Sequence, residues 1–205
     1  MKKLNLLPSL GAALFLSVTG AIAAAPPVGS AAPDFSLTGA DGKAHALADY
    51  KGKTVVLEWT NPGCPFVRKH YDTGNLPKLQ AEYTKKGVVW LAIDSSAEGA
   101  EGYLAPDAAK KATGGDYKAV SELLIDAEGK VGHLYGATNT PDMFIINPEG
   151  KIVYEGAIDS IASADKGDIA KATNYVQVGL DESLAGKPVS KAMSKPYGCG
   201  VKYKH

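Results

Sequence analysis

The feature that most constrains the fold of this chain is an apolar segment that ends at a cysteine and a proline, residues 53–65. Its first part, KTVVLEW, is continuous and rich in valine, as expected of a β-strand buried on both faces. A helix is predicted to begin at Cys64, because Pro65 suits the first helical position, where no backbone N–H is needed. Such a strand needs helices on both faces of its sheet, so the segment favours an α/β fold.

Further strands and helices are predicted in alternation along the chain. Gly74 and Pro77 interrupt the first helix, so we expect a break and then a second helix that Gly87 ends. After it come a buried strand (88–94), a loop (95–106), a helix (106–115), and a short strand followed by a turn at Glu128-Gly129 (121–136). The right-handed crossovers of such βαβ units make the first half of the sheet parallel.

Two β-hairpins and a last helix complete the predicted domain. Asp41-Gly42 lies between the two arms of residues 30–53, which is a strong hairpin signal. A second hairpin covers residues 142–158, and apolar residues at helical spacing predict a helix over 163–186. The result is an α/β domain with a central mixed β-sheet flanked by helices. The tail from residue 187 to 205 has little apolar content and no clear element.

The first 25 residues have the three-part pattern of a secretory signal peptide. Two lysines precede an apolar region, and small residues from Ala23 to Ala25 offer an A-x-A cleavage site. The alternative is a membrane anchor, but the apolar region is short and interrupted by Pro8, whereas a spanning helix needs roughly 20 apolar residues. We expect a periplasmic or secreted protein with a signal peptide at 1–25, one domain at 26–186 and a tail at 187–205.

The charge and the cysteine count restrict the classes of partner. Removing Lys2 and Lys3 from the 22 basic residues leaves 20, against 22 acidic residues, so the exported chain has a net charge of −2. This balance gives no electrostatic basis for binding nucleic acid or, once the signal peptide is removed, an anionic membrane. The two cysteines form an even count, which in an oxidising compartment predicts a pair.

Cys64 occupies a position that favours an ionised thiol. It lies where a strand ends and a helix starts, and the free N–H groups and positive dipole end of that helix favour an anion. Arg68, one turn further, adds a positive charge if its side chain folds back. Both effects lower the pKa of a thiol, and the thiolate is the nucleophile. The alternative is a buried, inert cysteine.

Three segments resemble the thioredoxin superfamily. KTVVLEWTNPGCPFVRKHY (53–71) resembles its first strand and active-site helix, and ATNTPDMFIINPEGKIVYEGAID (137–159) resembles its closing segment. APDFSLTGADGKAHALADYKGK (32–53) is similar to the branch that contains the peroxiredoxins and the alkyl hydroperoxide reductase / thiol-specific antioxidant proteins. The resemblance covers residues 29–186. It implies a thioredoxin-like fold with an N-terminal β-hairpin extension, and thiol-dependent oxidoreductase activity.

The resemblance also implies roles for individual residues. Cys64 corresponds to the attacking cysteine of the family's C-x-x-C turn. Pro141 corresponds to the proline that is cis in this superfamily, with Thr140 before it, whereas only about 5–6% of X-Pro bonds are cis in folded proteins. The loop that holds this proline lies against the active-site turn in the family.

The chain departs from the family pattern at two places. The second cysteine of C-x-x-C is Val67, so the turn cannot close a local disulfide. The peroxiredoxin signature P-x-x-x-T-x-x-C is not met, because Asn61 occupies the place of the threonine and Thr60 lies one residue too early. Thr60 could still reach Cys64 if the loop bends, and Arg68 could orient a peroxide.

Cys199 is the predicted partner of Cys64. It lies between Gly198 and Gly200, and glycines on both sides allow a close backbone approach and free rotation. One interpretation is a permanent disulfide that pins the tail; closing a loop of about 136 residues would stabilise the fold by ~5 kcal/mol in the chain-entropy model. The other is a mobile resolving cysteine that condenses with an oxidised Cys64.

Other polar residues receive weaker interpretations. His70 is interpreted as a surface or packing residue, because it lies almost two helical turns beyond Cys64. Asp142 follows the predicted cis-proline, where it either tunes substrate preference or is solvated. A copper site would need two neighbouring cysteines and a distal histidine, and Val67 and the distant Cys199 argue against it. No metal and no cofactor are expected.

The leading hypothesis is an exported thioredoxin-like oxidoreductase with antioxidant activity. Its predicted site consists of Cys64, Cys199, Pro141, Thr60 and Arg68. Cys64 would attack a peroxide or a protein or small-molecule disulfide, Cys199 would resolve the product, and an external thiol would reduce the pair again. The alternatives are a non-catalytic periplasmic domain with a structural Cys64–Cys199 disulfide, and a copper chaperone.

Overall fold

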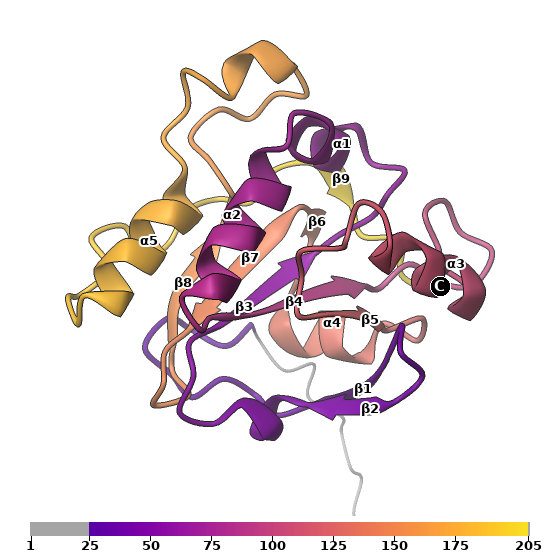
Figure 1. Cartoon of the computed structure of the whole chain (residues 1–205), viewed down its shortest axis with the longest axis horizontal. Helices are drawn as coiled ribbons and strands as arrows, with labels where there is room; N and C mark the ends of the chain where they lie inside the picture. The colour runs from indigo at the N-terminus through magenta and orange to yellow at the C-terminus, as the bar shows by residue number, and fades with distance from the viewer. Residues whose placement is uncertain (1–24, 205) are drawn as a thin grey trace, which may run out of the picture.

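The computed structural model describes residues 25–204. The signal peptide predicted at 1–25 lies outside the described residues, except for its last residue. A seven-stranded sheet forms the centre, in the order β2-β1-β5-β4-β3-β7-β8 (Figure 1). Its strands are β1 (Ser36–Gly39), β2 (Ala44–Ala46), β3 (Val55–Trp59), β4 (Val89–Asp94), β5 (Glu122–Ile125), β7 (Asp142–Ile146) and β8 (Ile152–Gly156).

The helices and two short strands complete the described part of the chain. The α-helices are α1 (Pro65–Asp72), α2 (Asn75–Lys85), α3 (Pro106–Thr113), α4 (Lys130–Tyr135) and α5 (Tyr175–Leu184), and the 3-10 helices are η1 (Leu47–Tyr50) and η2 (Lys166–Asp168). The strands β6 (Asn139–Thr140) and β9 (Cys199–Gly200) pair with each other outside the main sheet. No helix of the described residues is long and apolar enough to cross a membrane.

The prediction of a mixed sheet with a buried central strand is confirmed. Strand β3 pairs parallel with β4 on one side and antiparallel with β7 on the other. Every residue of β3 is buried, which explains its continuous apolar sequence. Both predicted hairpins are present, since β1 pairs with β2 and β7 pairs with β8, each antiparallel.

Helices cover both faces of the sheet. One face packs on a core that includes residues of α1, α2, α3 and α5, whereas the other packs on α4 and the segment before β1. Consecutive residues of β3 serve the two cores, since Val56 joins the first and Leu57 the second. The sheet therefore fixes the direction of β3 from both sides and, with it, the position of the turn that follows.

One helix was missed and another is shorter than predicted. The strand and the turn predicted within residues 121–136 are present, but the turn leads into the helix α4, which lies between Gly129 and Gly136, both with positive φ. Six residues are too few for a periodic pattern to stand out. The helix expected over 163–186 is α-helical only from Tyr175, because the Asn174 side chain accepts a hydrogen bond from the Gln177 N–H and caps the helix there.

The C-terminal tail has more regular structure than was expected. It first runs beside β8, where Glu155 N–H donates to Ala192 O and Ser194 N–H donates to Glu155 O. It then crosses to β6 and forms β9. Figure 1 shows it, in yellow, running from α5 past the start of α1.

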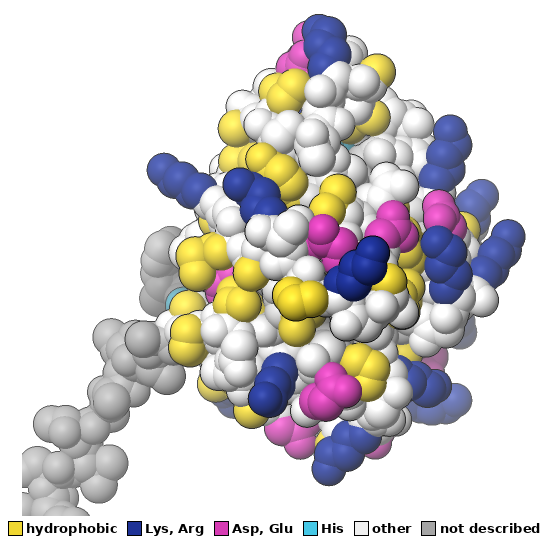
Figure 2. Space-filling model, turned by 90° about the vertical axis from the view of Figure 1, so that its left-hand side faces the viewer, with side chains coloured by type: hydrophobic (Ala, Val, Ile, Leu, Met, Phe, Trp, Pro, Cys, Tyr) yellow, Lys and Arg dark blue, Asp and Glu magenta, His cyan; other side chains and the backbone are white. Residues whose placement is uncertain are grey.

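The space-filling view of the side that includes α5 shows acidic and basic side chains interspersed (Figure 2).

Candidate functional site

Cys64 is the N-cap residue of α1, at the end of the turn that leaves β3. Its side chain is 2% exposed, and its thiol donates a hydrogen bond of 3.1 Å to the carbonyl oxygen of Thr140. Asn61 shapes the turn: its Oδ1 accepts from Gly63 N–H at 2.7 Å, and its Nδ2 donates to Glu101 O at 2.8 Å. The prediction of a helix beginning at this cysteine is confirmed.

The segment before β7 brings the second cysteine to the first. The Thr140–Pro141 peptide bond is cis, as predicted. Thr140 pairs directly with Cys199 in the antiparallel β6–β9 ladder, and Asn139 Nδ2 donates to Gly198 O at 3.0 Å. The structure therefore brings Cys64, Pro141 and Cys199 together. Both cysteines are free thiols in it.

The two thiols have different ionisation tendencies. Burial would raise the pKa of Cys64, but the neighbouring Cys199 thiol and the backbone N–H groups of Val67 and Cys199 outweigh it and lower that pKa. Burial, followed by the hydrogen bond and the charge of Cys64, raises the pKa of Cys199 to about 11. The pair therefore ionises first at Cys64, and a thiolate is a stronger nucleophile than a thiol.

Two predicted site residues have other partners. The Thr60 hydroxyl hydrogen-bonds to the hydroxyl of Tyr117 at 2.9 Å. The Arg68 guanidinium donates to the carboxylates of Asp72 and Asp116. These carboxylates hold Arg68 in ion pairs, so its side chain does not fold back on Cys64. Within the described residues, neither Thr60 nor Arg68 forms a hydrogen bond with a cysteine thiol.

Sequence reasoning missed the buried carboxyl group of Glu58. Its oxygens accept hydrogen bonds from Tyr71 OH at 2.7 Å, Trp90 Nε1 at 2.7 Å and Gln80 Nε2 at 3.0 Å. Burial raises its pKa, and the hydrogen bonds oppose that rise. A charged residue inside the apolar run TVVLEW was the available signal, because such a residue is buried only with partners.

Asp142, the residue after Pro141, is buried and not solvated. Its Oδ2 accepts a weak hydrogen bond of 3.3 Å from Thr138 N–H, and its Oδ1 has no hydrogen-bond partner among the described protein atoms. Burial raises its pKa to about 7, the Thr138 N–H opposes this, and the nearby charge of Glu155 adds to it. An acid in this state gains a proton near neutral pH, which couples the segment around Pro141 to pH.

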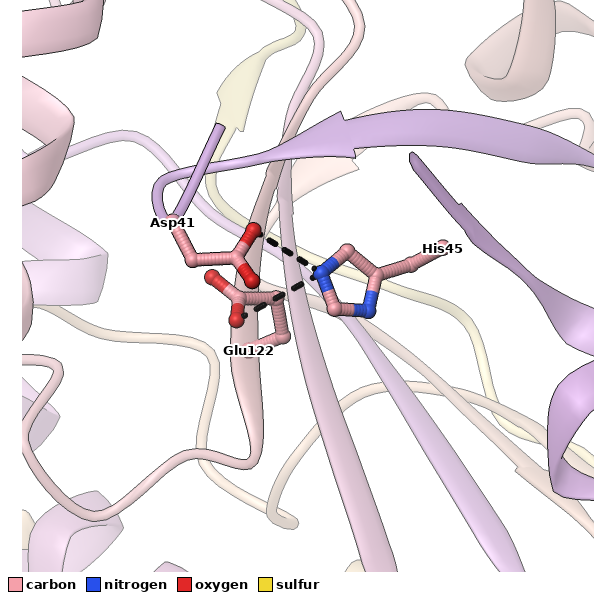
Figure 3. A group of neighbouring side chains, drawn as sticks. All are labelled: Asp41, His45 and Glu122. Carbon is pink, nitrogen blue, oxygen red and sulfur yellow. Dashed lines mark hydrogen bonds and ion pairs between the residues drawn. The ribbon is translucent and has the colours of Figure 1, made fainter. Parts of the chain in front are cut away.

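One group of potential metal ligands lies away from the cysteines. His45, Asp41 and Glu122 form it, and it is the only group of three such residues found within residues 25–204 (Figure 3). His45 Nε2 lies 3.0 Å from Asp41 Oδ1 and 3.7 Å from Glu122 Oε2, and His45 Nδ1 lies 3.1 Å from Tyr50 OH. These contacts explain why the three side chains lie close together: the histidine lies between two carboxylates with which it interacts. In the described part of the chain no third ligand joins the two cysteines, as a copper site would require.

Comparisons of sequence identify relatives for most of the chain. The model of the AhpC/TSA family matches residues 28–155. The thiol-disulfide oxidoreductase ResA of Bacillus thuringiensis is 30% identical over 128 residues, which are 62% of this chain and 68% of that protein. The thioredoxin-like protein YneN of Bacillus subtilis is 32% identical over 124 residues, which are 60% of this chain and 68% of YneN.

Solved structures share the fold. An uncharacterised conserved protein of Geobacillus kaustophilus is 30% identical with a TM-score of 0.72, over 87% of this chain and 93% of that one. A hypothetical protein of Sinorhizobium meliloti is 24% identical with a TM-score of 0.74, over 88% of this chain and 97% of that one. The thioredoxin domain of a thiol-disulfide oxidoreductase of Bacteroides vulgatus is 25% identical with a TM-score of 0.51, over 72% of this chain and 97% of that domain.

Proposed function

The chain belongs to the AhpC/TSA family, and from its site we propose that it is an exported thiol-disulfide oxidoreductase that cycles between a Cys64–Cys199 dithiol and a disulfide. The observation that carries the proposal is the direct pairing of Cys199 with Thr140, whose carbonyl oxygen also accepts a hydrogen bond from the Cys64 thiol. The resemblance of residues 1–25 to a signal peptide supports export. The two named relatives, a thiol-disulfide oxidoreductase and a thioredoxin-like protein, support the reaction class.

In the proposed reaction, the Cys64 thiolate attacks one sulfur of a substrate disulfide. The substrate S–S bond breaks, a mixed disulfide forms at Cys64, and the first substrate thiolate leaves and takes up a proton. Cys199 loses its proton and attacks the Cys64 sulfur, which releases the second substrate thiol. The substrate is then reduced by two electrons and the enzyme is oxidised to the Cys64–Cys199 disulfide. An external dithiol exchanges with that disulfide and restores both thiols.

The different ionisation of the two cysteines supports this order of steps. Cys64 ionises first and attacks, while the adjacent negative charge helps to keep Cys199 protonated. Formation of the mixed disulfide removes that charge, and Cys199 then loses one of the causes that raise its pKa. The resolving thiol therefore becomes available after the first step and not before it.

A disulfide substrate is better supported than a peroxide. Asn61, which takes the place of the peroxiredoxin threonine, directs its side chain to Gly63, Ser96 and Glu101. Arg68, which could have oriented a peroxide, is paired with two carboxylates. A peroxide would be reduced by the same pair, with Cys64 forming a sulfenic acid and Cys199 condensing with it to release water. A purely structural disulfide remains the alternative.

Turnover and trapping test the proposal. Wild type, Cys64→Ser and Cys199→Ser are compared in the reduction of a protein disulfide and of hydrogen peroxide, with excess dithiothreitol. Cys64→Ser is expected to abolish turnover. Cys199→Ser, mixed with the protein disulfide in the absence of dithiothreitol, is expected to accumulate a mixed disulfide visible by mass spectrometry. Full turnover by Cys64→Ser contradicts the proposal. A reduction potential below about −300 mV for the Cys64–Cys199 pair, with no turnover, would indicate a structural disulfide instead.

A further inference from the structure

A buried charged cluster, which the proposed chemistry does not use, lies under the tail. Lys69 and His70 of α1 are 0% exposed, and Asp159 is 3% exposed. Lys69 Nζ lies 3.4 Å from Asp159 Oδ2 and donates to Ile161 O at 3.2 Å. A buried ion pair gains little stability, because taking both charges out of water opposes their attraction. Stabilisation of the fold therefore does not explain why these charged residues are buried here.

Tyr197 of the tail is fixed on this cluster. Its hydroxyl donates to Asp159 Oδ1 at 2.6 Å and lies 3.3 Å from His70 Nε2. Its ring packs edge to face on Phe66, with ring centres 5.9 Å apart. The same side chain is thus held by a charged hydrogen bond at its tip and by an aromatic contact along its side.

The donors and acceptors form a chain with one direction. Burial lowers the pKa of His70 to about 4, so its ring is neutral near neutral pH. Asn75 Nδ2 lies 2.8 Å from His70 Nδ1 and can only donate, which places the ring proton on Nε2. His70 then donates to the Tyr197 hydroxyl, and Tyr197 donates to Asp159. Each group has a partner that fits, so the hydroxyl has one preferred position.

This anchor lies two residues before Cys199. The intervening Gly198 passes so close to β6 that a Cβ on it would lie 2.1 Å from the Thr140 carbonyl oxygen. A short, tightly packed connection transmits the position of Tyr197 to Cys199. On the other side of Cys199, Tyr203 OH donates to Ala137 O at 2.7 Å. The tail is therefore held on both sides of its cysteine, and the side nearer to α1 uses the buried cluster.

We propose that Tyr197 is a positioning residue that holds Cys199 against Cys64, and that the buried Lys69–Asp159 pair with His70 is the support on which it is held. This inference rests on the proposed function, since it assumes that the two cysteines exchange. An anchored thiol has a high effective concentration at its partner, and releasing the anchor lowers that concentration without touching either sulfur.

The equilibrium with glutathione measures this effect. One protein dithiol and one glutathione disulfide give one protein disulfide and two glutathione thiols, and the equilibrium constant reports the effective concentration of Cys199 at Cys64. Tyr197→Phe keeps the ring on Phe66 but removes a hydrogen bond to a charged group, and is expected to lower the constant by about tenfold. Single-turnover resolution of a Cys64–glutathione mixed disulfide is expected to slow by a similar factor.

Tyr83→Phe is the matched control. The Tyr83 hydroxyl of α2 donates to Asp181 of α5 at 2.6 Å, a bond of the same kind away from the cysteines, and its loss is expected to leave the constant unchanged. Asn75→Ala removes only the far end of the chain of donors and is expected to lower the constant by about threefold. It provides a second test should Tyr197→Phe fold poorly.

The outcomes separate this inference from the proposed function. If Tyr197→Phe and Asn75→Ala change the melting temperature but keep the wild-type equilibrium constant with glutathione, Tyr197 has only a structural role. This result overturns the inference but not the proposed function. A wild-type protein that forms no Cys64–Cys199 disulfide at any glutathione ratio overturns the proposed function as well. A lower constant in both variants and not in Tyr83→Phe supports the positioning role.

Discussion

Cys199 lies directly opposite Thr140 in the two-residue ladder between β9 and β6. The Thr140 carbonyl oxygen accepts a hydrogen bond from the Cys64 thiol, so one backbone segment lies against both cysteine residues. Two cysteines that are far apart in the sequence therefore meet at the residue that precedes the cis-proline.

The first prediction concerns the close approach of Gly198 to Thr140. Gly198 has φ +129°, and a Cβ there would lie 2.1 Å from the Thr140 carbonyl oxygen. Gly198→Ala is expected to displace β9, to lower the glutathione equilibrium constant of the cysteine pair by more than about tenfold and to destabilise the protein by roughly 1–3 kcal/mol. Thiol trapping and denaturant unfolding measure the two effects.

Gly200→Ala is the control for this change. A Cβ on Gly200 would meet its nearest neighbour, Thr138 O, at 4.0 Å, and Gly200 does not have a positive φ. Its substitution is expected to change stability by less than about 0.5 kcal/mol. If Gly198→Ala and Gly200→Ala changed the glutathione equilibrium constant and the stability equally, the close packing of Gly198 on Thr140 would not be what positions Cys199.

The second prediction concerns the ionisation of the thiols. Ultraviolet titration of the thiolate band should show Cys64 ionising below its ordinary pKa and Cys199 only near pH 11. Cys199→Ala removes a hydrogen-bond donor, so the pKa of Cys64 should rise. Cys64→Ala removes a neighbouring negative charge, so the pKa of Cys199 should fall. If each single-cysteine variant titrated as in the wild type, the two thiols would not be coupled.

The third prediction concerns pH and stability at Asp142. The pKa of this group is about 7 in the folded protein and 3.8 in the reference state, so the folded protein binds a proton more tightly. Stability should therefore fall as pH rises from about 4 to about 7, by on the order of 4 kcal/mol for this group. Asp142→Asn mimics the protonated acid and should be the more stable protein at pH 8, but not at pH 4.

Denaturant unfolding at several pH values measures this difference. Asp107→Asn in α3, an exposed position, is the control and should leave the difference between pH 4 and pH 8 unchanged. Parallel stability curves for wild type and Asp142→Asn would show that the carboxyl group ionises normally in the folded protein.

The fourth prediction concerns Arg68. Its guanidinium is bound by Asp72 and Asp116, and its side chain is 33% exposed. Arg68→Ala is expected to change disulfide and peroxide turnover by less than about twofold, and stability by roughly 0–1 kcal/mol, as for surface ion pairs. Steady-state kinetics with both substrates provide the test. A tenfold loss with peroxide alone would restore its predicted role in orienting that substrate.

Local sequence signals predicted the strand and helix on either side of the site. The valine run of β3 and the Cys64-Pro65 pair act within a few residues, and both elements begin close to where they were expected. The cis bond at Pro141 followed from the family resemblance and is present. Local signals failed where an element is short, as in α4 and β9, because a few residues show no periodicity.

Only the tertiary structure decided the partners of the polar side chains. Arg68 could have folded toward Cys64, but Asp116, which is distant in the sequence, and Asp72 bind it instead. His70 was expected to be a surface or packing residue, and it is buried under Tyr197. A hydrogen bond or ion pair depends on which distant segments the packed sheet brings together, and this is not encoded in neighbouring residues.

The sequence by itself determined that a cysteine stands at the start of a helix behind a buried strand, because backbone preferences and hydrophobic burial act locally. The tertiary structure determined what that cysteine meets. The path of the tail along β8 and onto β6 sets the position of Cys199, and the buried carboxyl groups of Glu58 and Asp142 find their surroundings only when the sheet forms. Such contacts between distant segments arise from packing, which no single stretch of the chain specifies.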